Sequence, residues 1–175
     1  MSNGTFVVSG SGAGIGGAAD GLSYVYKGVT GDATITARVA ANTWTGGGAQ
    51  KTGIMMRESL ADNAIAFSMT SGDGGVREAR SGRRTTTGGP MSFQTGNAYT
   101  RAPGWFRLQR AGNTVTAYQS TDGRTWFTVG TPVTVSMAAT YYVGLAVSSN
   151  SSNVNTATYD SLTVTSGAIN GKMCL

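Results

Sequence analysis

The chain has 175 residues, a net charge of +5, 27 glycines and only 12% charged residues. This length suffices for one domain with a sizeable core. No apolar run is long enough to cross a membrane, and the positive charge is too dispersed to indicate a nucleic-acid partner by itself.

Alternating apolar and polar residues predict eleven short strands and no helix. The clearest is 33–40, where Ile35, Ala37 and Val39 share one face, because successive side chains of a strand point to opposite faces. In chain order the predicted strands are 5–9, 22–27, 33–40, 53–57, 64–70, 76–80, 105–110, 114–120, 126–130, 141–148 and 156–165. Gly112 and Asn113 predict a tight hairpin, and 81–100 is predicted as a long loop. This pattern predicts an all-β fold, a two-sheet antiparallel β-sandwich over residues 1–175.

Several segments carry a family resemblance. They are GDATITARV at 31–39, KTGIMMRES at 51–59, GWFRLQRAGNTVTAY at 104–118, YVGLAVSS at 142–149 and ATYDSLTV at 157–164. They resemble the concanavalin A-like lectin/glucanase domains (laminin-G-like jelly rolls) of bacterial secreted proteins. The resemblance covers about residues 10–165, leaves 166–175 as a tail, and implies a jelly-roll sandwich. These are core and turn motifs, so they specify fold rather than chemistry.

Two loop motifs are better explained as turns than as sites. Gly12, Gly14 and Gly17 approach a G-x-G-x-x-G spacing, but a strand follows where a dinucleotide fingerprint needs a helix. Residues 120–126, STDGRTW, resemble the Asp-box turn of sialidase-type propellers. There the Asp122 carboxylate can accept backbone N–H groups. We interpret this turn as structural, with Trp126 at the sheet edge or in the core.

The absence of histidine and the placement of the carboxylates argue against catalysis. The chain contains no histidine, which excludes Ser-His-Asp catalysis and histidine-bound metals. Glucanases of the resembled class place paired carboxylates along one strand, because acid and nucleophile must flank one bond. No predicted strand here carries two carboxylates on one face. We therefore expect no enzyme activity.

Calcium is the one cofactor the resemblance leaves open. Sandwich lectins of this kind often hold Ca²⁺ with carboxylate and backbone oxygens at loop ends. Asp32 and Asp160 lie at family-like positions near the first and last strands, which could be neighbours. The alternative is that both cap turns and accept backbone hydrogen bonds.

Arg77, Arg80, Arg83 and Arg84 form the densest basic cluster in the sequence. Arg83 and Arg84 are predicted in a Thr/Gly loop after the strand. Together the four guanidinium groups could bind sulfated or uronic glycans, phosphates or an acidic surface, because a guanidinium matches such oxyanions bidentately. The alternative is a solvated edge strand that charge protects from aggregation.

An aromatic on a polar loop gives a second ligand candidate. Trp44 lies in the Thr/Gly-rich stretch 42–48, where an exposed indole could stack on the apolar face of a pyranose. Anchoring of the loop in the core is the alternative. Tyr99 and Asn150 are further candidates for the same surface.

The chain ends bear on location. The start, MSNG, has neither the basic nor the apolar segment of a signal peptide. A lone cysteine, Cys174, cannot close an intramolecular disulfide, and it either cross-links two chains or is an unpaired end residue. The glycine-, serine- and threonine-rich composition is typical of secreted bacterial modules. We therefore expect the protein to be either intracellular or separated from its signal and neighbouring domains, and the composition favours the extracellular alternative.

Together these observations predict a non-catalytic extracellular module that binds carbohydrate, a glycan or other polysaccharide, anionic chains included. No nucleic-acid partner and no membrane span are expected. The alternative is a structural or adhesive subunit that self-associates through strand edges or sheet faces.

Overall fold

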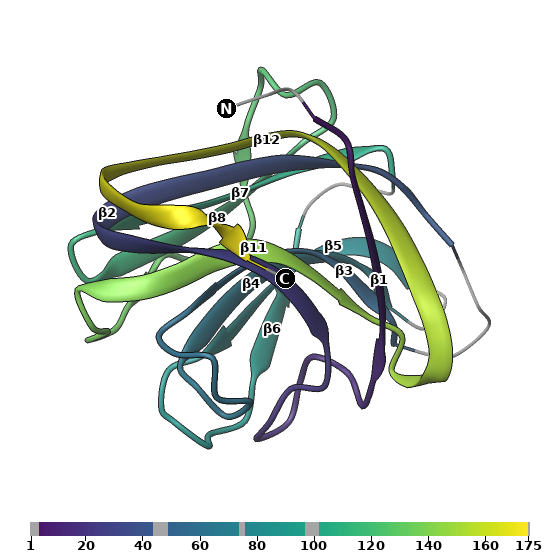
Figure 1. Ribbon diagram of the computed structural model, residues 1–175, viewed down its shortest axis with the longest axis horizontal. Helices are drawn as coiled ribbons and strands as arrows, with labels where there is room; N and C mark the ends of the chain where they lie inside the picture. Colours follow the sequence, from purple (N-terminus) through teal and green to yellow (C-terminus); the bar gives the residue numbers. More distant parts are fainter. Residues whose placement is uncertain (1–3, 44–48, 74–75, 97–101, 175) are drawn as a thin grey trace.

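The computed structural model describes residues 4–43, 49–73, 76–96 and 102–174, with the backbone alone for residues 73, 76, 77 and 167–174. All regular elements in these residues are β-strands, and every pairing is antiparallel (Figure 1). No helix among them could cross a membrane. The predicted all-β class is confirmed.

The described residues contain twelve strands. They are β1 (Phe6–Gly12), β2 (Ser23–Asn42), β3 (Lys51–Arg57), β4 (Ala66–Asp73), β5 (Val76–Arg84), β6 (Ser92–Thr95), β7 (Gly104–Ala111), β8 (Thr114–Ser120), β9 (Phe127–Thr128), β10 (Val133–Thr134), β11 (Thr140–Ser148) and β12 (Ser151–Cys174).

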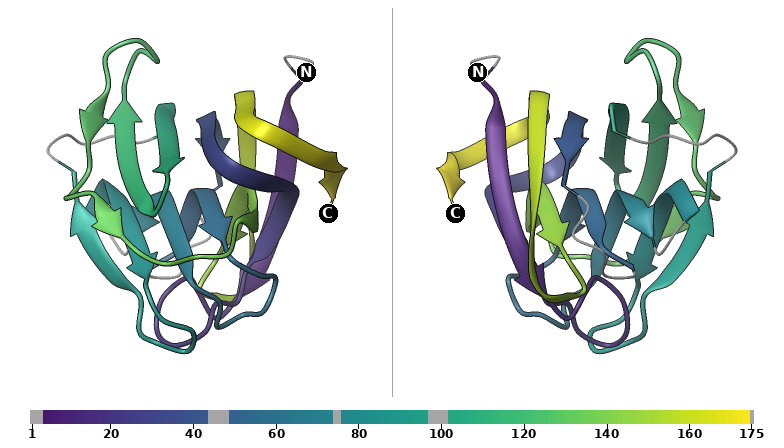
Figure 2. Two further views of the ribbon diagram at one scale, coloured as in Figure 1. Left: turned by 90° about the vertical axis from the view of Figure 1, so that its left-hand side faces the viewer. Right: turned by 90° about the vertical axis from the view of Figure 1, so that its right-hand side faces the viewer.

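The strands form two layers joined through β2. The first layer has the order β10-β8-β7-β2-β12-β1, with β9 beside β8, and the second has the order β2-β11-β3-β4-β5-β6. In Figure 1 the layer containing β7 and β12 lies above the layer containing β4 and β6. In both side views of Figure 2, β1 and β12 lie at the same border of the molecule.

Residues 23–30 of β2 pair with β11, whereas residues 33–39 pair with β7. The sequence predicts two strands here, and the structure has one that changes neighbour at Gly31. Gly31 has a φ of 77°, which glycine adopts without steric cost. A bend at this position lets one strand serve both layers.

The main core lies between the layers. It is built from inward-facing side chains of both, among them Ile35, Phe106 and Leu108 of the first layer and Ile54, Met56, Phe67 and Met69 of the second. Each is almost completely buried. Since the described residues contain no disulfide, this apolar burial is the dominant stabilising term.

A smaller core covers the outer face of the second layer. Ile15, in the loop between β1 and β2, packs against Met55, Ala66, Met91 and Ala146. Because β3 is therefore covered on both faces, all seven of its residues are buried. This explains why its sequence, KTGIMMR, does not alternate.

Three predicted boundaries are wrong. The predicted loop 81–100 begins too early, since β5 continues to Arg84, and β6 lies inside it. The tail expected from residue 166 continues β12, which pairs with β2 as far as Cys174. Residues 126–130 contribute only the two-residue strand β9. Backbone pairing with a neighbour, which local alternation does not reveal, decides each of these boundaries.

Candidate ligand-binding site

A buried ionic network joins three loops at one end of the sandwich. The Asp20 carboxylate accepts hydrogen bonds from Arg57 Nη1 at 2.6 Å and from Arg84 Nη2 at 2.7 Å. The side chains of Asp20 and Arg84 are 0% exposed, and that of Arg57 is 3% exposed. Charges buried this deeply are tolerated only when they are paired and hydrogen-bonded.

The remaining arginine donors fix the loops 13–22, 58–65 and 85–91. They donate to the backbone carbonyls of Gly16, Gly17, Ala61, Asp62, Ala64 and Gly89. Arg84 lies on strand β5, not in a loop as predicted, and it is completely buried. Its guanidinium group is therefore not accessible to a ligand. We call this network the Asp20 lock.

Beside the lock lies a surface hollow of about 290 Å³. It is lined by Asp20, Leu22, Tyr24, Tyr26, Arg57, Leu60 and Asp62, and we call it the tyrosine hollow. The rings of Tyr24 and Tyr26 are stacked with centroids 5.6 Å apart. Tyr142 of β11 meets the Tyr26 ring edge-on at 5.3 Å. The result is a continuous row of three aromatic rings.

Among the described residues, one tyrosine hydroxyl of the hollow is already hydrogen-bonded within the protein, and two beside it are not. The Tyr24 hydroxyl donates to the Met55 carbonyl at 3.0 Å, and burial raises the pKa of Tyr24 well above its ordinary value. In the described part of the chain, the hydroxyls of Tyr26 and Tyr142 have no hydrogen-bond partner. They remain free to bond an incoming hydroxyl group.

The charges around the hollow cancel. Two arginines, Arg57 and Arg84, face the two carboxylates of Asp20 and Asp62. The Nη groups of both arginines already donate to protein atoms. An anionic group would find no free positive charge here. The hollow therefore suits an uncharged polar ligand with apolar faces.

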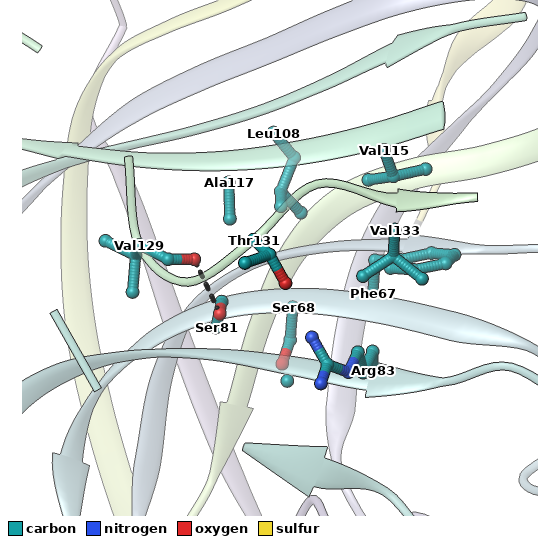
Figure 3. A pocket seen from close by; sticks show the side chains of 11 residues that line it. Phe67, Ser68, Ser81, Arg83, Leu108, Val115, Ala117, Val129, Thr131 and Val133 are labelled. Atoms are coloured by element: carbon teal, nitrogen blue, oxygen red, sulfur yellow. Dashed lines mark hydrogen bonds between the residues drawn. The ribbon is translucent and has the colours of Figure 1, made fainter. Parts of the chain in front are cut away.

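The other predicted arginines lie apart from the hollow. Arg80 pairs with Glu78 at 3.8 Å, and the side chain of Arg77 lies outside the described residues. Arg83 Nη1 donates to Gln94 Oε1 at 2.6 Å. Arg83 stands at a cavity between the layers (Figure 3). That cavity measures about 20 Å³, room for about one water molecule and no sugar.

Trp44 and Tyr99 lie outside the described residues. Asn150 is exposed at the turn between β11 and β12, with a φ of 54°. Its side chain packs against Gly14, where an added Cβ atom would lie 2.3 Å from Asn150 Oδ1. The structure therefore places Asn150 in a turn that supports the loop 13–22.

The predicted metal ligands do not meet. Asp160 bonds Arg38 at 2.9 Å, and Asp32 Oδ1 accepts from the Gly112 N–H at 2.7 Å. Arg38 lies opposite Asp160 in the sheet and six positions after Asp32 on β2. Six positions along a strand correspond to about 20 Å, so Asp32 and Asp160 are separated by about that distance. The two strands are neighbours, as expected, but their register keeps the two carboxylates apart. No group of three or more potential metal-ligating residues occurs in the described ranges.

The Asp-box turn is confirmed as a turn. Asp122 Oδ1 accepts from the backbone N–H groups of Arg124 and Thr125, both at 2.8 Å, and from the Ser120 hydroxyl at 2.9 Å. These bonds stabilise the carboxylate and lower the pKa of Asp122 to about 2. Trp126 lies on the outer face of the first layer, half-buried over Arg107.

The tyrosine hollow was not predicted from the sequence. The residues SYVYK at the start of β2 alternate, which places Tyr24 and Tyr26 on one face, and two tyrosines sharing an exposed strand face were the available signal. Leu60 and Tyr142 come from distant segments, so no local sequence pattern indicates that they lie beside Tyr24 and Tyr26.

Comparisons with known proteins support the fold. No protein-family model and no curated protein matches the sequence. A functionally unknown protein from Saccharomyces cerevisiae is similar in structure, with a TM-score of 0.76 and 16% identity over 96% of this chain and 91% of that chain.

Two carbohydrate-active enzymes are also similar. The GH43 protein BlXynB from Bacillus licheniformis has a TM-score of 0.60 and 13% identity, over 83% of this chain and 29% of that one. An alginate lyase from Corynebacterium sp. has a TM-score of 0.55 and 14% identity, over 80% and 61%. The chain thus spans less than two thirds of either enzyme. At these identities the likeness concerns the fold, an antiparallel jelly-roll type of sandwich.

Proposed function

We propose that this chain is a non-catalytic, extracellular module of the concanavalin A-like lectin/glucanase class that binds a neutral polysaccharide. The observation that carries the proposal is the tyrosine hollow, where a row of three rings borders a rigid, charge-balanced floor. Structural neighbours named as a GH43 protein and an alginate lyase support a carbohydrate ligand.

The chemistry of the hollow matches a sugar. The apolar face of a pyranose packs on an aromatic ring, and the polar end of tyrosine bonds its hydroxyl groups. Tyr26 and Tyr142 offer both the ring and a free hydroxyl, and Leu60, 48% exposed, adds apolar surface. Most ligand pockets have volumes of about 300–1,000 Å³, so this hollow suits one or two sugar units.

The carboxylates of the hollow favour binding over hydrolysis. A glycosidase needs two carboxyl groups, one to protonate the leaving oxygen and one to attack or activate water. Both oxygens of Asp20 accept hydrogen bonds from buried arginines. Asp62 is then the single carboxylate left with access to a sugar in the hollow. A lone carboxylate can bond a hydroxyl group but cannot complete that mechanism.

The test is affinity electrophoresis through gels containing xylan, xyloglucan or laminarin, three neutral polysaccharides. At least one gel should retard the protein, and Tyr26→Ala should weaken that retardation at least tenfold. Phe127→Ala is the matched control, since Phe127 is an aromatic residue with 57% exposure on another strand. Retardation by none of the gels, or an equal loss in both variants, would overturn the proposal, as would release of new reducing ends.

Self-association is a second candidate, favoured by the edge strand β1. Within the described residues β1 pairs only with β12, and Val7 on it is 67% exposed. Unprotected edges of this kind are ready to pair with another chain. Size-exclusion chromatography tests the idea: concentration-dependent oligomers that Val7→Lys abolishes would support it, and a monomer at all concentrations would dismiss it.

A further inference from the structure

We propose a second ligand site on the outer face of the first layer, where Arg107 binds the carboxylate of a uronate-containing polysaccharide. This face carries none of the residues of the tyrosine hollow. Its evidence is a single arginine that is positioned and partly desolvated and that has no counter-charge among the described residues.

Strand alternation puts Arg107 on this face. On β7 the residues Phe106 and Leu108 point into the core, so Trp105, Arg107 and Gln109 point outward. Arg107 lies opposite Thr36 of β2 and Tyr118 of β8. The site is thus built on three paired strands, which hold side chains more rigidly than loops do.

The Asp-box turn folds onto the same face. Trp126 lies over the Arg107 guanidinium, with 3.8 Å between the Arg107 Cζ atom and the ring centroid. The ring of Trp105 packs on Gly123, where an added Cβ atom would lie 2.8 Å from the ring. The Asp122 hydrogen bonds fix this turn. Arg107 is therefore held in place before any ligand binds.

The hydrogen bonds of Arg107 are incomplete. Its Nε donates to Thr36 Oγ1 at 3.1 Å, while Nη1 and Nη2 have no partner in the described part of the chain. Burial lowers the pKa of Arg107, which means that its charge is desolvated without full compensation. By contrast, Arg38 pairs with Asp160, and Arg57 and Arg84 pair with Asp20.

The free edge of this guanidinium fits a carboxylate. Stacking on Trp126 uses the flat face of the group and leaves its terminal edge, Nη1 and Nη2, open in the plane. A planar carboxylate can accept two parallel hydrogen bonds along that edge. Such a charge-assisted pair, partly shielded from water by the Trp126 ring, gives the site its selectivity for an acid over a neutral sugar.

A shallow hollow beside Arg107 indicates a chain rather than a small anion. It measures about 330 Å³, and it is lined by Asp32, Ala33, Thr34, Gln109, Arg110, Ala111, Thr165 and Ser166. Gln109 follows Arg107 by two positions on the same strand face, so the hollow begins about 7 Å from it. Its hydroxyl and amide groups can bond the hydroxyls of the neighbouring sugar units.

The test compares polygalacturonate with its fully methyl-esterified form, which removes the charge and keeps the sugar chain. Affinity electrophoresis should show retardation by polygalacturonate and at least tenfold weaker retardation by the ester. Arg107→Gln and Arg107→Lys should each weaken binding at least tenfold, because lysine keeps the charge but lacks the two-pronged edge. Arg124→Gln removes one charge from the exposed turn nearby and should change binding less than twofold.

The outcomes distinguish a specific Arg107 site from general attraction between a basic protein and a polyanion. Equal losses in Arg107→Gln and Arg124→Gln, full binding by Arg107→Lys, or equal retardation by single-stranded DNA would each overturn the proposal. So would binding of the ester as tight as binding of the acid. Tyr26→Ala should leave polygalacturonate binding unchanged, so failure of the tyrosine hollow and failure of this site give different results. Circular dichroism of each variant checks that it is folded.

Discussion

Replacing Asp20 with asparagine should destabilise the protein strongly. The change keeps the shape of the side chain but leaves two guanidinium groups, 0% and 3% exposed, without their counter-charge. Removing one partner of a buried ion pair costs about 3–5 kcal/mol, and Asp20 serves two arginines. For a chain of this size each kcal/mol corresponds to about 2–4 °C in Tm, so Tm should fall by roughly 6–20 °C.

Differential scanning calorimetry and urea unfolding measure the effect. Asp160→Asn is the matched control, because its partner Arg38 is 36% exposed, and an exposed pair contributes at most about 1 kcal/mol. Added salt should hardly weaken the ion pairs of the Asp20 lock, since buried pairs are poorly screened. If the two variants melt within about 2 °C of each other, a difference worth no more than about 1 kcal/mol, the lock does not hold the three loops together.

Two other predictions concern single hydrogen-bonded groups. Tyr159→Phe should lower the free energy of unfolding by about 1–3 kcal/mol in urea titrations. The buried Tyr159 hydroxyl accepts a hydrogen bond from the Gly53 N–H at 3.1 Å and donates one to the Ala146 carbonyl at 2.9 Å. An unchanged free energy of unfolding would mean that other groups replace these bonds. For Asp122, NMR titration of the carboxyl group should give a pKa of about 2. The contribution of this carboxylate to the stability of the folded state is then complete above the ordinary pKa near 4 and is lost as the pH falls through 2. A measured pKa near 4 would contradict the hydrogen bonds of the turn.

Local patterns predicted those parts of the molecule whose causes are local. Alternation in residues 33–40 requires only that one face of a strand be buried, and the observed burial follows it. The Asp122 turn is held by residues within three positions. Gly112 has a φ of 56° at the predicted hairpin. In each case the partner groups are neighbours in sequence, so the sequence pattern carries the information.

The candidate sites depend on distant partners, which local patterns do not reveal. Arg84 was predicted as an exposed loop cation because its counter-ion, Asp20, lies 64 positions away. Asp32 and Asp160 lie on adjacent strands, yet the register of β2 and β12 separates them. Register is set by the burial pattern of whole strands and not by the carboxylates. The contact of Trp126 with Arg107 on the outer face depends on the pairing of β7 with β8, which no local pattern reveals.

The Asp20 lock also determines how this scaffold can be diversified. The loops 13–22, 58–65 and 85–91 share the donors of two arginines, so a length change in one loop misplaces carbonyl acceptors for the other two. Libraries of new binding loops built there would mostly yield unfolded proteins. The turn at 120–126 contains its own hydrogen-bond acceptor in Asp122. It can be varied without misplacing the acceptors of another loop, provided that Gly123 and Trp126 keep their contacts with Trp105 and Arg107. This makes the first layer the place to engineer new specificity.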